Sequence, residues 1–285
     1  MTTPDEYRDR YGPWALVTGA SSGIGEHFAR RLADRGFNLL VAARRLDRLE
    51  ALAKELRDTH GVEVVPVAID LAADDVADAL VGACGERDVG LVVSNAGLGM
   101  KGLLADADAE QLEDMLAVNC RAPMLVARAF APRLLARGRG GLVLVGSIEG
   151  FQGYPWSTAY AATKGFVHSL GEGLWGELRP KGVDVLVVAP GGTDTEILSN
   201  QGIDKRMLVG LMKPGEVAER SLDHLGRGPV YVVGASNKVL VGVLRVLPRR
   251  LALRAAGMGM HQTLERSAVR RAKEARGGRG GDGQG

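Results

Sequence analysis

Hydrophobic and polar positions follow two alternating patterns from residue 13 to about residue 238. Short runs that are apolar almost throughout, such as Leu142–Val145 and Val185–Val188, are typical of parallel strands buried on both faces. The longer segments between them carry apolar residues at helical spacing, which predicts helices with one buried face. We expect strands at 14–18, 38–42, 63–69, 90–94, 141–146, 183–189 and 229–234, and helices at 24–35, 46–59, 74–86, 110–136, 157–179 and 214–225.

A strand followed by a helix, repeated about six times, predicts an α/β fold with a doubly wound parallel sheet and helices on both faces. We expect about seven strands in the order 3-2-1-4-5-6-7 and one domain over residues 1–238. Leucines at helical spacing around Pro248 predict a basic, apolar helical extension over 239–276. The glycine-rich end at 277–285 is expected to be disordered.

A glycine-rich turn joins the first expected strand to the first expected helix. It contains Gly19, Ser21, Ser22, Gly23, Ile24 and Gly25, with the spacing Gly-x-x-x-Gly-x-Gly. Glycines allow a tight turn and close backbone approach, and the helix N-terminus that follows favours a pyrophosphate. The position between a strand and a helix predicts a Rossmann-type dinucleotide-binding turn rather than a plain surface turn.

The end of the second expected strand bears on the choice of cofactor. An NAD site usually places Asp or Glu there to bind the ribose hydroxyls, but this chain has Ala43, Arg44 and Arg45, and no acid before Asp47. An arginine fork suits a 2′-phosphate, so the sequence favours NADP, with NAD less favoured. The alternative is that both arginines merely end a surface turn.

Tyr160 and Lys164 lie four residues apart in an expected helix, and Ser147 precedes Tyr160 by thirteen residues. Residues four apart share a helix face, so the phenol and the ammonium are expected side by side. A nearby cation favours the phenolate and would lower the tyrosine pKa from about 10. A tyrosine with a pKa nearer neutral can exchange a proton with a substrate. The spacing alone also occurs on ordinary solvated helices.

Taken together, these motifs closely resemble the short-chain dehydrogenase/reductase family over about residues 13–238. The resemblance rests on the glycine turn together with Asp70-Leu71, Asn95-Ala96-Gly97, Asn119, Ser147, Tyr160, Lys164, Pro190-Gly191, Thr193 and Thr195. Some positions depart from the common family pattern: Ser94 stands where a second Asn is frequent, and Gly146 and Ile148 flank Ser147.

The resemblance implies a catalytic group of four residues. Tyr160 would be the general acid/base, and Ser147 would hydrogen-bond the same substrate oxygen. Lys164 would lower the Tyr160 pKa and hold the nicotinamide ribose, and Asn119 would anchor a water in a proton relay. Ser147 and Asn119 each have a plain alternative, as a strand-end hydroxyl and a polar helix residue.

The resemblance also implies the cofactor contacts. The three glycines would lie against the pyrophosphate, Asp70 and Leu71 beside the adenine, Asn95, Ala96 and Gly97 near a ribose, Pro190 and Gly191 along the nicotinamide, and Thr193 and Thr195 at its carboxamide end. Asp70 could instead form a turn, and Asn95 could be structural. His27 and His168 are expected to be structural.

The family pattern implies a lid at about 196–213, which carries Ile197, Leu198, Ile203, Met207, Leu208, Leu211 and Met212. The preceding loop adds Phe151, Tyr154 and Trp156, and Leu98 and Met100 could add more, so a hydrophobic carbonyl or alcohol substrate is favoured. The leading hypothesis is an NADP-dependent oxidoreductase that moves a hydride between the nicotinamide and such a substrate. The alternatives are an NAD-linked alcohol dehydrogenase and a non-catalytic, cofactor-binding regulatory protein.

The distribution of charge along the chain limits which partners are expected. The 285 residues carry a net charge of +2, but ten Lys/Arg against three Asp/Glu follow from residue 245 onward. The basic segment could pack on the body or a second subunit, contact an anionic membrane, or be a solvated tail. Nucleic-acid binding is not expected, because the tail lacks aromatic residues and the body is acidic.

Compartment and assembly are inferred more indirectly. Cys84 and Cys120 look like reduced core cysteines, and residues 1–11 do not resemble a signal peptide, so a cytoplasmic protein is expected. No metal site is expected. The family resemblance implies a homodimer or homotetramer that packs residues 110–136 and 157–179 across an interface.

Overall fold

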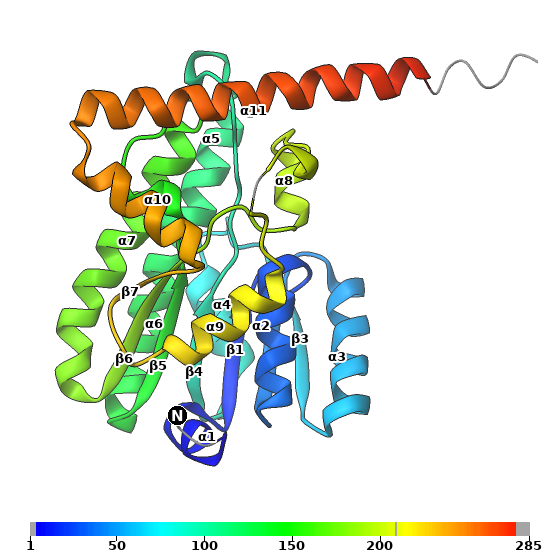
Figure 1. The fold of residues 1–285 in the computed structure, drawn as a ribbon. Coiled ribbons are helices and arrows are strands. Elements are labelled where there is room, and N and C mark those ends of the chain that lie inside the picture. The colour runs from blue at the N-terminus through cyan, green and yellow to red at the C-terminus, as the bar shows by residue number, and fades with distance from the viewer. Residues whose placement is uncertain (1–3, 209, 278–285) are drawn as a thin grey trace, which may run out of the picture.

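Seven parallel strands form one sheet in the order β3-β2-β1-β4-β5-β6-β7, which confirms the predicted strand number and order. The computed structural model describes residues 4–208 and 210–277 (Figure 1). The strands are β1 (Trp14–Thr18), β2 (Asn38–Ala43), β3 (Val64–Ala68), β4 (Val89–Ser94), β5 (Gly140–Val145), β6 (Val183–Ala189) and β7 (Val230–Val232). Strands β1, β4, β5 and β6 are buried along their whole length, as expected for strands with helices on both faces.

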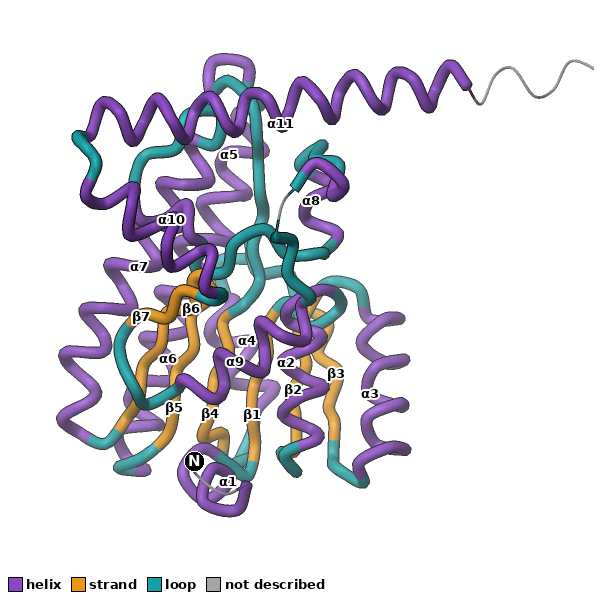
Figure 2. The backbone as a smooth tube through the Cα atoms, viewed as in Figure 1, coloured by secondary structure: helices purple, strands orange, loops and turns teal. Residues whose placement is uncertain are grey.

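Helices cover both faces of this sheet, so the doubly wound architecture is confirmed (Figure 2). One hydrophobic core joins the sheet to α2 (Gly23–Asp34), α3 (Leu46–His60) and α9 (Pro214–His224). The other core joins it to α4 (Val76–Cys84), α6 (Ala122–Arg137) and α7 (Thr158–Leu178). The remaining helices are α1 (Pro4–Tyr11), α5 (Ala109–Leu116), α8 (Glu196–Asn200), α10 (Ala235–Val246) and α11 (Arg249–Gly277).

The long helix expected at 110–136 is interrupted. Helix α5 ends at Leu116, a π-helical segment spans Ala117–Arg121, and α6 follows from Ala122. Pro123 has no N–H to donate to the carbonyl of Asn119, four residues earlier, so the regular α-helical ladder cannot continue there. The predicted helix is therefore present, and the π-helical turn within it, which was not predicted, contains Asn119 of the expected catalytic group.

The chain after β7 forms two helices, α10 and α11, which meet at Pro248 as the sequence suggested. Helix α11 crosses the carboxyl end of the sheet, above α5 and α8 (Figure 1). It is attached to the body by the Ser267 hydroxyl, which accepts a hydrogen bond from the Asp204 N–H at 3.0 Å, and by His261, whose ring centroid lies 4.4 Å from that of Trp156. Nearly all of the expected disordered segment, 278–285, lies outside the described residues.

Helix α1 was not anticipated from the sequence. Its Tyr11 hydroxyl donates to the buried Asp184 carboxylate of β6 at 2.7 Å, and Arg10 donates to the same carboxylate at 2.8 Å. These contacts attach the N-terminal helix below the sheet, at the end opposite α11 (Figure 1). Among the described helices, none combines the length and the apolar character needed to cross a membrane.

Candidate active site

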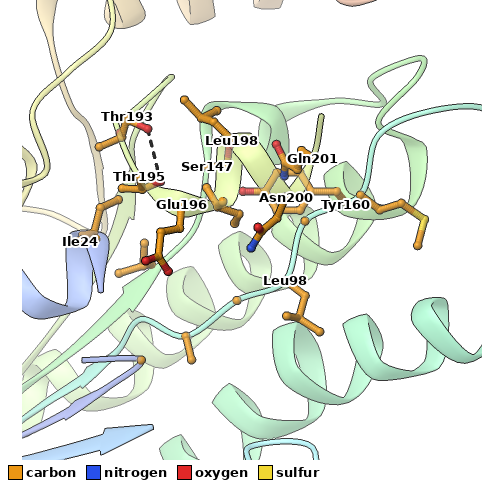
Figure 3. A pocket seen from close by; sticks show the side chains of 18 of the residues that line it. Ile24, Leu98, Ser147, Tyr160, Thr193, Thr195, Glu196, Leu198, Asn200 and Gln201 are labelled. Atoms are coloured by element: carbon orange, nitrogen blue, oxygen red, sulfur yellow. Dashed lines mark hydrogen bonds between the residues drawn. The ribbon is translucent and has the colours of Figure 1, made fainter. Parts of the chain in front are cut away.

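A pocket of about 840 Å³ lies at the carboxyl ends of the strands, and residues of α8 and α11 also line it. Loops that follow β1, β2, β4, β5 and β6 line it, and these are the loops where α/β sheets bind ligands. Figure 3 shows side chains from these separate segments, among them Ile24, Leu98, Ser147, Tyr160 and Glu196, around one cavity. The fold therefore brings together motifs that are far apart in the chain.

The glycine turn after β1 is built around contacts too close for any side chain. Gly19 and Gly23 have φ angles of 68° and 60°, in the left-handed region that favours glycine. A Cβ on Gly25 would lie 2.3 Å from both the Gly19 carbonyl oxygen and the Asn95 amide nitrogen. That Asn95 amide donates to the Thr18 carbonyl at 3.0 Å and to the Gly19 carbonyl at 3.3 Å. Asn95 thus holds the turn in place, which agrees with the structural reading of this residue.

Arg45 lies at the rim of the pocket, beside the glycine turn. Its guanidinium donates to the Ser22 hydroxyl at 2.7 Å and to the Ser21 hydroxyl at 3.1 and 3.2 Å. Ser22 is the N-cap residue of α2, but its side chain makes no capping hydrogen bond. Arg44 is exposed at the same rim. Both arginines and both serines therefore surround one end of the pocket.

Two charged residues at this rim were not expected from the sequence. The Glu196 carboxylate of α8 accepts from Arg45 at 2.8 Å and from Arg48 at 2.5 Å. Hydrogen bonds from Arg48 and Arg45 lower the pKa of Glu196 to about 2. Arg48 lies in the first turn of α3, and Glu196 follows it 148 residues later in the chain. No sequence motif connects the two.

The remaining expected cofactor residues also line the pocket. These are Asp70, Leu71, Asn95, Ala96, Gly97, Pro190, Gly191, Thr193 and Thr195, and Gly192, which was not expected, lines the pocket with them. Asp70 additionally accepts from the Ala72 N–H at 3.0 Å, so it forms the turn that was considered as its alternative role. The Thr195 hydroxyl donates to the Thr193 carbonyl at 3.3 Å (Figure 3).

The expected catalytic residues meet on the floor of the pocket. Tyr160 and Lys164 come from α7, and the Lys164 Nζ atom lies 5.6 Å from the centre of the Tyr160 ring. Ser147 follows β5, and its side chain hydrogen-bonds to Tyr160. The Lys164 ammonium donates to the Val145 carbonyl at 2.9 Å. The shared helix face predicted for Tyr160 and Lys164 is therefore present.

Asn119 supports this group from the π-helical segment. Its buried amide accepts from the Leu98 N–H at 2.8 Å and donates to the Leu98 carbonyl at 2.8 Å and to the Thr163 hydroxyl at 3.0 Å. A Cβ added to Gly97 would lie 3.2 Å from Lys164 Nζ and 3.3 Å from Asn119 Oδ1, which places both side chains around this glycine. Asn119 thus joins the loop after β4 to α7.

Burial reverses the expected direction of the Tyr160 pKa. Burial raises this pKa above its usual value, the Glu149 carboxylate raises it further, and the hydrogen bond with Ser147 lowers it. Burial also lowers the pKa of Lys164 to about 8. Both shifts have the same cause, because removal from water disfavours the charged form of either group. His168 is also buried, and its pKa falls to about 4.

The substrate side of the pocket is mainly apolar, but its lining differs from the expectation. Leu98, Met100, Tyr154, Ile197, Leu198, Ile203, Met207 and Leu208 line it as expected. Phe151 and Trp156 do not, because the Phe151 ring lies 4.5 Å from that of His168 and Trp156 contacts His261. Leu211 and Met212 do not line it either, and Met212 is buried in a hydrophobic core instead. Helix α11 contributes Met260 and Thr263, which the sequence did not suggest.

The family model for short chain dehydrogenase matches residues 13–206. The chain belongs to the short-chain dehydrogenase family. It is 31% identical over 233 residues to a 7beta-hydroxysteroid dehydrogenase of Clostridium sardiniense, with 81% of this chain and 89% of that protein covered. It is therefore an oxidoreductase of the kind that acts on CH–OH groups.

Two solved structures extend the comparison. A structure from work on 7beta-hydroxysteroid dehydrogenase stereoselectivity has a TM-score of 0.82 at 29% identity, over 88% of this chain and 99% of that one. A short-chain dehydrogenase from Sphingobium yanoikuyae in complex with NADPH has a TM-score of 0.74 at 35% identity, over 83% of this chain and 97% of that one.

The pocket of this short-chain dehydrogenase fits a nicotinamide dinucleotide. Gly19 and Gly23 leave the backbone bare where the cavity meets the N-terminus of α2. Gly25, expected at the pyrophosphate, does not line the cavity, because it is buried against Gly19 and Asn95. The cavity continues without interruption from Arg44 and Arg45 at one end to Tyr160 at the other. This arrangement provides an anion-binding helix end, a bare backbone and a proton-bearing group along one channel.

Proposed function

We propose that this protein is an NADP-dependent oxidoreductase that interconverts a bulky hydrophobic ketone and its secondary alcohol. The observation that carries the proposal is the meeting of Ser147, Tyr160 and Lys164 at the inner end of one channel, with the buried Asn119 behind them. A regulatory protein without turnover would have no use for a buried tyrosine and lysine, since both lose hydration energy there.

The proposed mechanism assigns each residue a separate task. Bound NADPH would supply the hydride, and the N-terminus of α2 with Gly19 and Gly23 would hold its pyrophosphate. Tyr160 donates the proton to the carbonyl oxygen, and Ser147 hydrogen-bonds that same oxygen. Lys164 would hold the ribose and offsets the negative charge that Tyr160 gains. Asn119 fixes the loop after β4 and the position of Thr163 on α7.

The preference for NADP over NAD is supported by Arg45. Its guanidinium is held by Ser21 and Ser22 against the glycine turn, with Arg44 exposed beside it. A guanidinium binds a phosphate through paired, charge-assisted hydrogen bonds, which NADH does not offer at this position. Related structures in complex with NADPH come from Sphingobium yanoikuyae and from an L-sorbose reductase.

The substrate class is supported by the apolar wall and by the names of relatives. Met100, Tyr154, Met207 and Met260 come from four different segments and line the space beyond Tyr160. Similar proteins are 7beta-hydroxysteroid dehydrogenases, and a similar structure is a bulky-bulky ketone specific alcohol dehydrogenase. We propose that residues 196–213 act as a lid over this space, with α11 above them.

Binding measurements test the cofactor half of the proposal. NADPH and NADH are titrated side by side against the wild type, Arg45→Ser and, as a matched control, Arg31→Ser, whose arginine pairs with Glu219 away from the pocket. We expect NADPH to bind more tightly than NADH, and Arg45→Ser to lose about 10-fold or more in NADPH affinity only. Equal binding of both cofactors would favour the NAD-linked alternative.

Turnover measurements test the catalytic half. A panel of oxosteroids and diaryl ketones is offered with NADPH, and Tyr160→Phe is compared with the wild type. We expect the variant to bind NADPH as the wild type does and to lose at least about 100-fold in turnover. Cofactor binding without turnover of any substrate would favour the regulatory alternative, and full activity of the variant would remove Tyr160 from its assigned role.

A further inference from the structure

A buried ion pair lies next to Tyr160, on residues that the proposed mechanism does not use. The Lys101 ammonium is 2.7 Å from each oxygen of the Glu149 carboxylate and 2.7 Å from the Ser157 hydroxyl. The Lys101 side chain is 2% exposed and the Glu149 side chain 15%. Lys101 Nζ lies 4.7 Å from the centre of the Tyr160 ring, closer than the 5.6 Å of Lys164.

Lys101 does not have the contacts of a group that binds an anionic substrate. An ammonium has three N–H donors, and here the two Glu149 oxygens and the Ser157 hydroxyl account for all three. A paired, buried charge of this kind contributes little net stability, because desolvation opposes the attraction. Fold stability therefore does not explain why the Lys101–Glu149 ion pair is present, and its position beside Tyr160 suggests a role in the site.

Ser157 connects the ion pair to the start of helix α7. It is the N-cap residue of α7, yet its side chain makes no capping hydrogen bond. An N-cap serine normally contributes about 1 kcal/mol to its helix. Here the hydroxyl accepts from Lys101 and donates to Glu149 instead. The network is thus attached to the first turn of the helix whose third residue is Tyr160.

The same network ties three separate segments together. Lys101 comes from the loop after β4, Glu149 from the 3₁₀ helix Ile148–Phe151, and Ser157 from the start of α7. A backbone hydrogen bond from the Gly102 N–H to the Trp156 carbonyl, 2.8 Å long, joins the first and third segments again. Loss of the network would free the turn that carries Tyr160 to move relative to Ser147.

The charges around Tyr160 come from several elements. Helix α7 supplies Lys164 and, one turn further, His168; the loop after β4 supplies Lys101; and the 3₁₀ helix supplies Glu149. Cys120 of the π-helical segment lies near Lys164, and Arg245 of α10, which stacks on Phe151, lies near His168. Glu149 opposes ionisation of Tyr160, and Lys101 neutralises that carboxylate.

We propose that Lys101, Glu149 and Ser157 form a positioning network for the catalytic tyrosine. The network holds the first turn of α7 so that the Tyr160 hydroxyl faces Ser147, and it keeps the wall beside the phenol electrically neutral. The inference rests on the proposed function only for the role of Tyr160 as acid/base.

Charge removal on either side of the pair gives opposite expectations. Glu149→Gln removes the carboxylate and favours the phenolate, so Tyr160 should ionise at lower pH. Lys101→Met leaves the carboxylate beside the phenol uncompensated, so Tyr160 should ionise at higher pH. Each shift is expected to be about 1 pH unit, the usual size for a charge 4–6 Å away. The double variant should return toward the wild type.

The test uses two measurements on the full chain. The first is the pH at which kcat/KM for NADPH-driven ketone reduction begins to fall, followed from pH 6 to 12 because burial raises the Tyr160 pKa above its usual value of about 10. The second is the tyrosinate absorbance near 295 nm over the same range, with the same variant carrying Tyr160→Phe subtracted. Lys54→Met and Asp58→Asn, which break an exposed ion pair on α3, serve as matched controls and should leave both measurements unchanged.

The order of the two single variants decides the proposal. It is supported if Glu149→Gln titrates at lower pH than Lys101→Met and if Ser157→Ala lowers kcat more than it raises KM. It is overturned if the two single variants share one pH dependence or appear in the reverse order. If the wild type reduces no ketone, the proposed function fails, while the absorbance titration still tests the network.

Discussion

Gly171 lets the helix that carries both Tyr160 and Lys164 lie directly on the sheet. It is buried in α7, and a Cβ at this position would lie 2.1 Å from Val187 Cγ2 of β6 and 3.3 Å from Leu144 Cδ1 of β5. Two residues later, Gly173 has nothing within 4 Å of such a Cβ. The same Gly→Ala change in one helix should therefore have opposite effects on stability.

The expected changes in the free energy of unfolding combine helix propensity with the cost of overpacking. Alanine is favoured over glycine inside a helix by about 1 kcal/mol, and this gain applies to both positions. At residue 171 the added methyl group must displace Val187, a stiff β-branched side chain that is fully buried. Overpacking of this kind costs about 1–3 kcal/mol, and a 2.1 Å approach belongs at the upper end. We expect Gly173→Ala to gain about 1 kcal/mol and Gly171→Ala to lose about 2.

Urea unfolding of the two variants and the wild type measures these differences directly. A separation of about 3 kcal/mol corresponds to a difference in Tm of about 6–12 °C for a domain of this size. Displacement of α7 should also lower turnover of Gly171→Ala, because Lys164 and Tyr160 lie about two and about three turns before it. Equal stabilities for the two variants would refute the packing argument.

Three further predictions concern charge and the C-terminal helix. Lys164→Met should raise stability at pH 7 by up to about 3 kcal/mol while it abolishes turnover, because burial lowers the folded-state pKa to about 8 from 10.5. The free-energy cost of burying the charged Lys164 is present below pH 8 and disappears as the pH rises to about 10.5. The gain in Tm of the variant should therefore vanish over this range, and a gain that stays constant with pH would contradict this prediction. Asp184→Ala should lower the free energy of unfolding by about 2–3 kcal/mol in urea, because the buried Tyr11 hydroxyl loses its acceptor; Asp9→Ala is an exposed control. A chain that ends after Leu247 lacks Met260 in the pocket wall and should raise KM for a bulky ketone about tenfold, with NADPH binding within about twofold; a parallel loss of NADPH affinity would show a wider structural effect.

The strands could be predicted from the sequence because burial on both faces leaves them continuously apolar. The expected bounds of β1 and β6 agree with the structure, and those of the other strands differ by a residue or two at either end. Helix α1 was missed because its eight residues direct only Tyr7 and Tyr11 into the core, which is too few for a recognisable period. The π-helical break in the helix at 110–136 was missed because Pro123 is also compatible with the first turn of a helix.

The site shows where sequence patterns stop being informative. Gly25 and Asn95 could be identified because each stands in a short motif, although the Asn95 amide and the Thr18 carbonyl that it binds are 77 residues apart. Lys101 and Glu149 are 48 residues apart, and only the adjacency of β4 and β5 brings them together. Trp156 was expected in the pocket because it belongs to a loop rich in aromatic residues, but it packs against His261 of α11 instead. No local sequence pattern could indicate a contact with a helix about a hundred residues away.

The directions of the two pKa shifts constrain how the site can work. Burial favours the neutral phenol of Tyr160 and brings the pKa of Lys164 to about 8, so the ammonium is protonated at neutral pH but close to release. Among the described residues that face Tyr160, Lys101 is already neutralised by Glu149. Lys164 is therefore the cation that is left to offset the charge on Tyr160 when it gives up its proton. A tyrosine that is hard to ionise holds its proton until a carbonyl oxygen accepts it, and Lys164 then stabilises the phenolate.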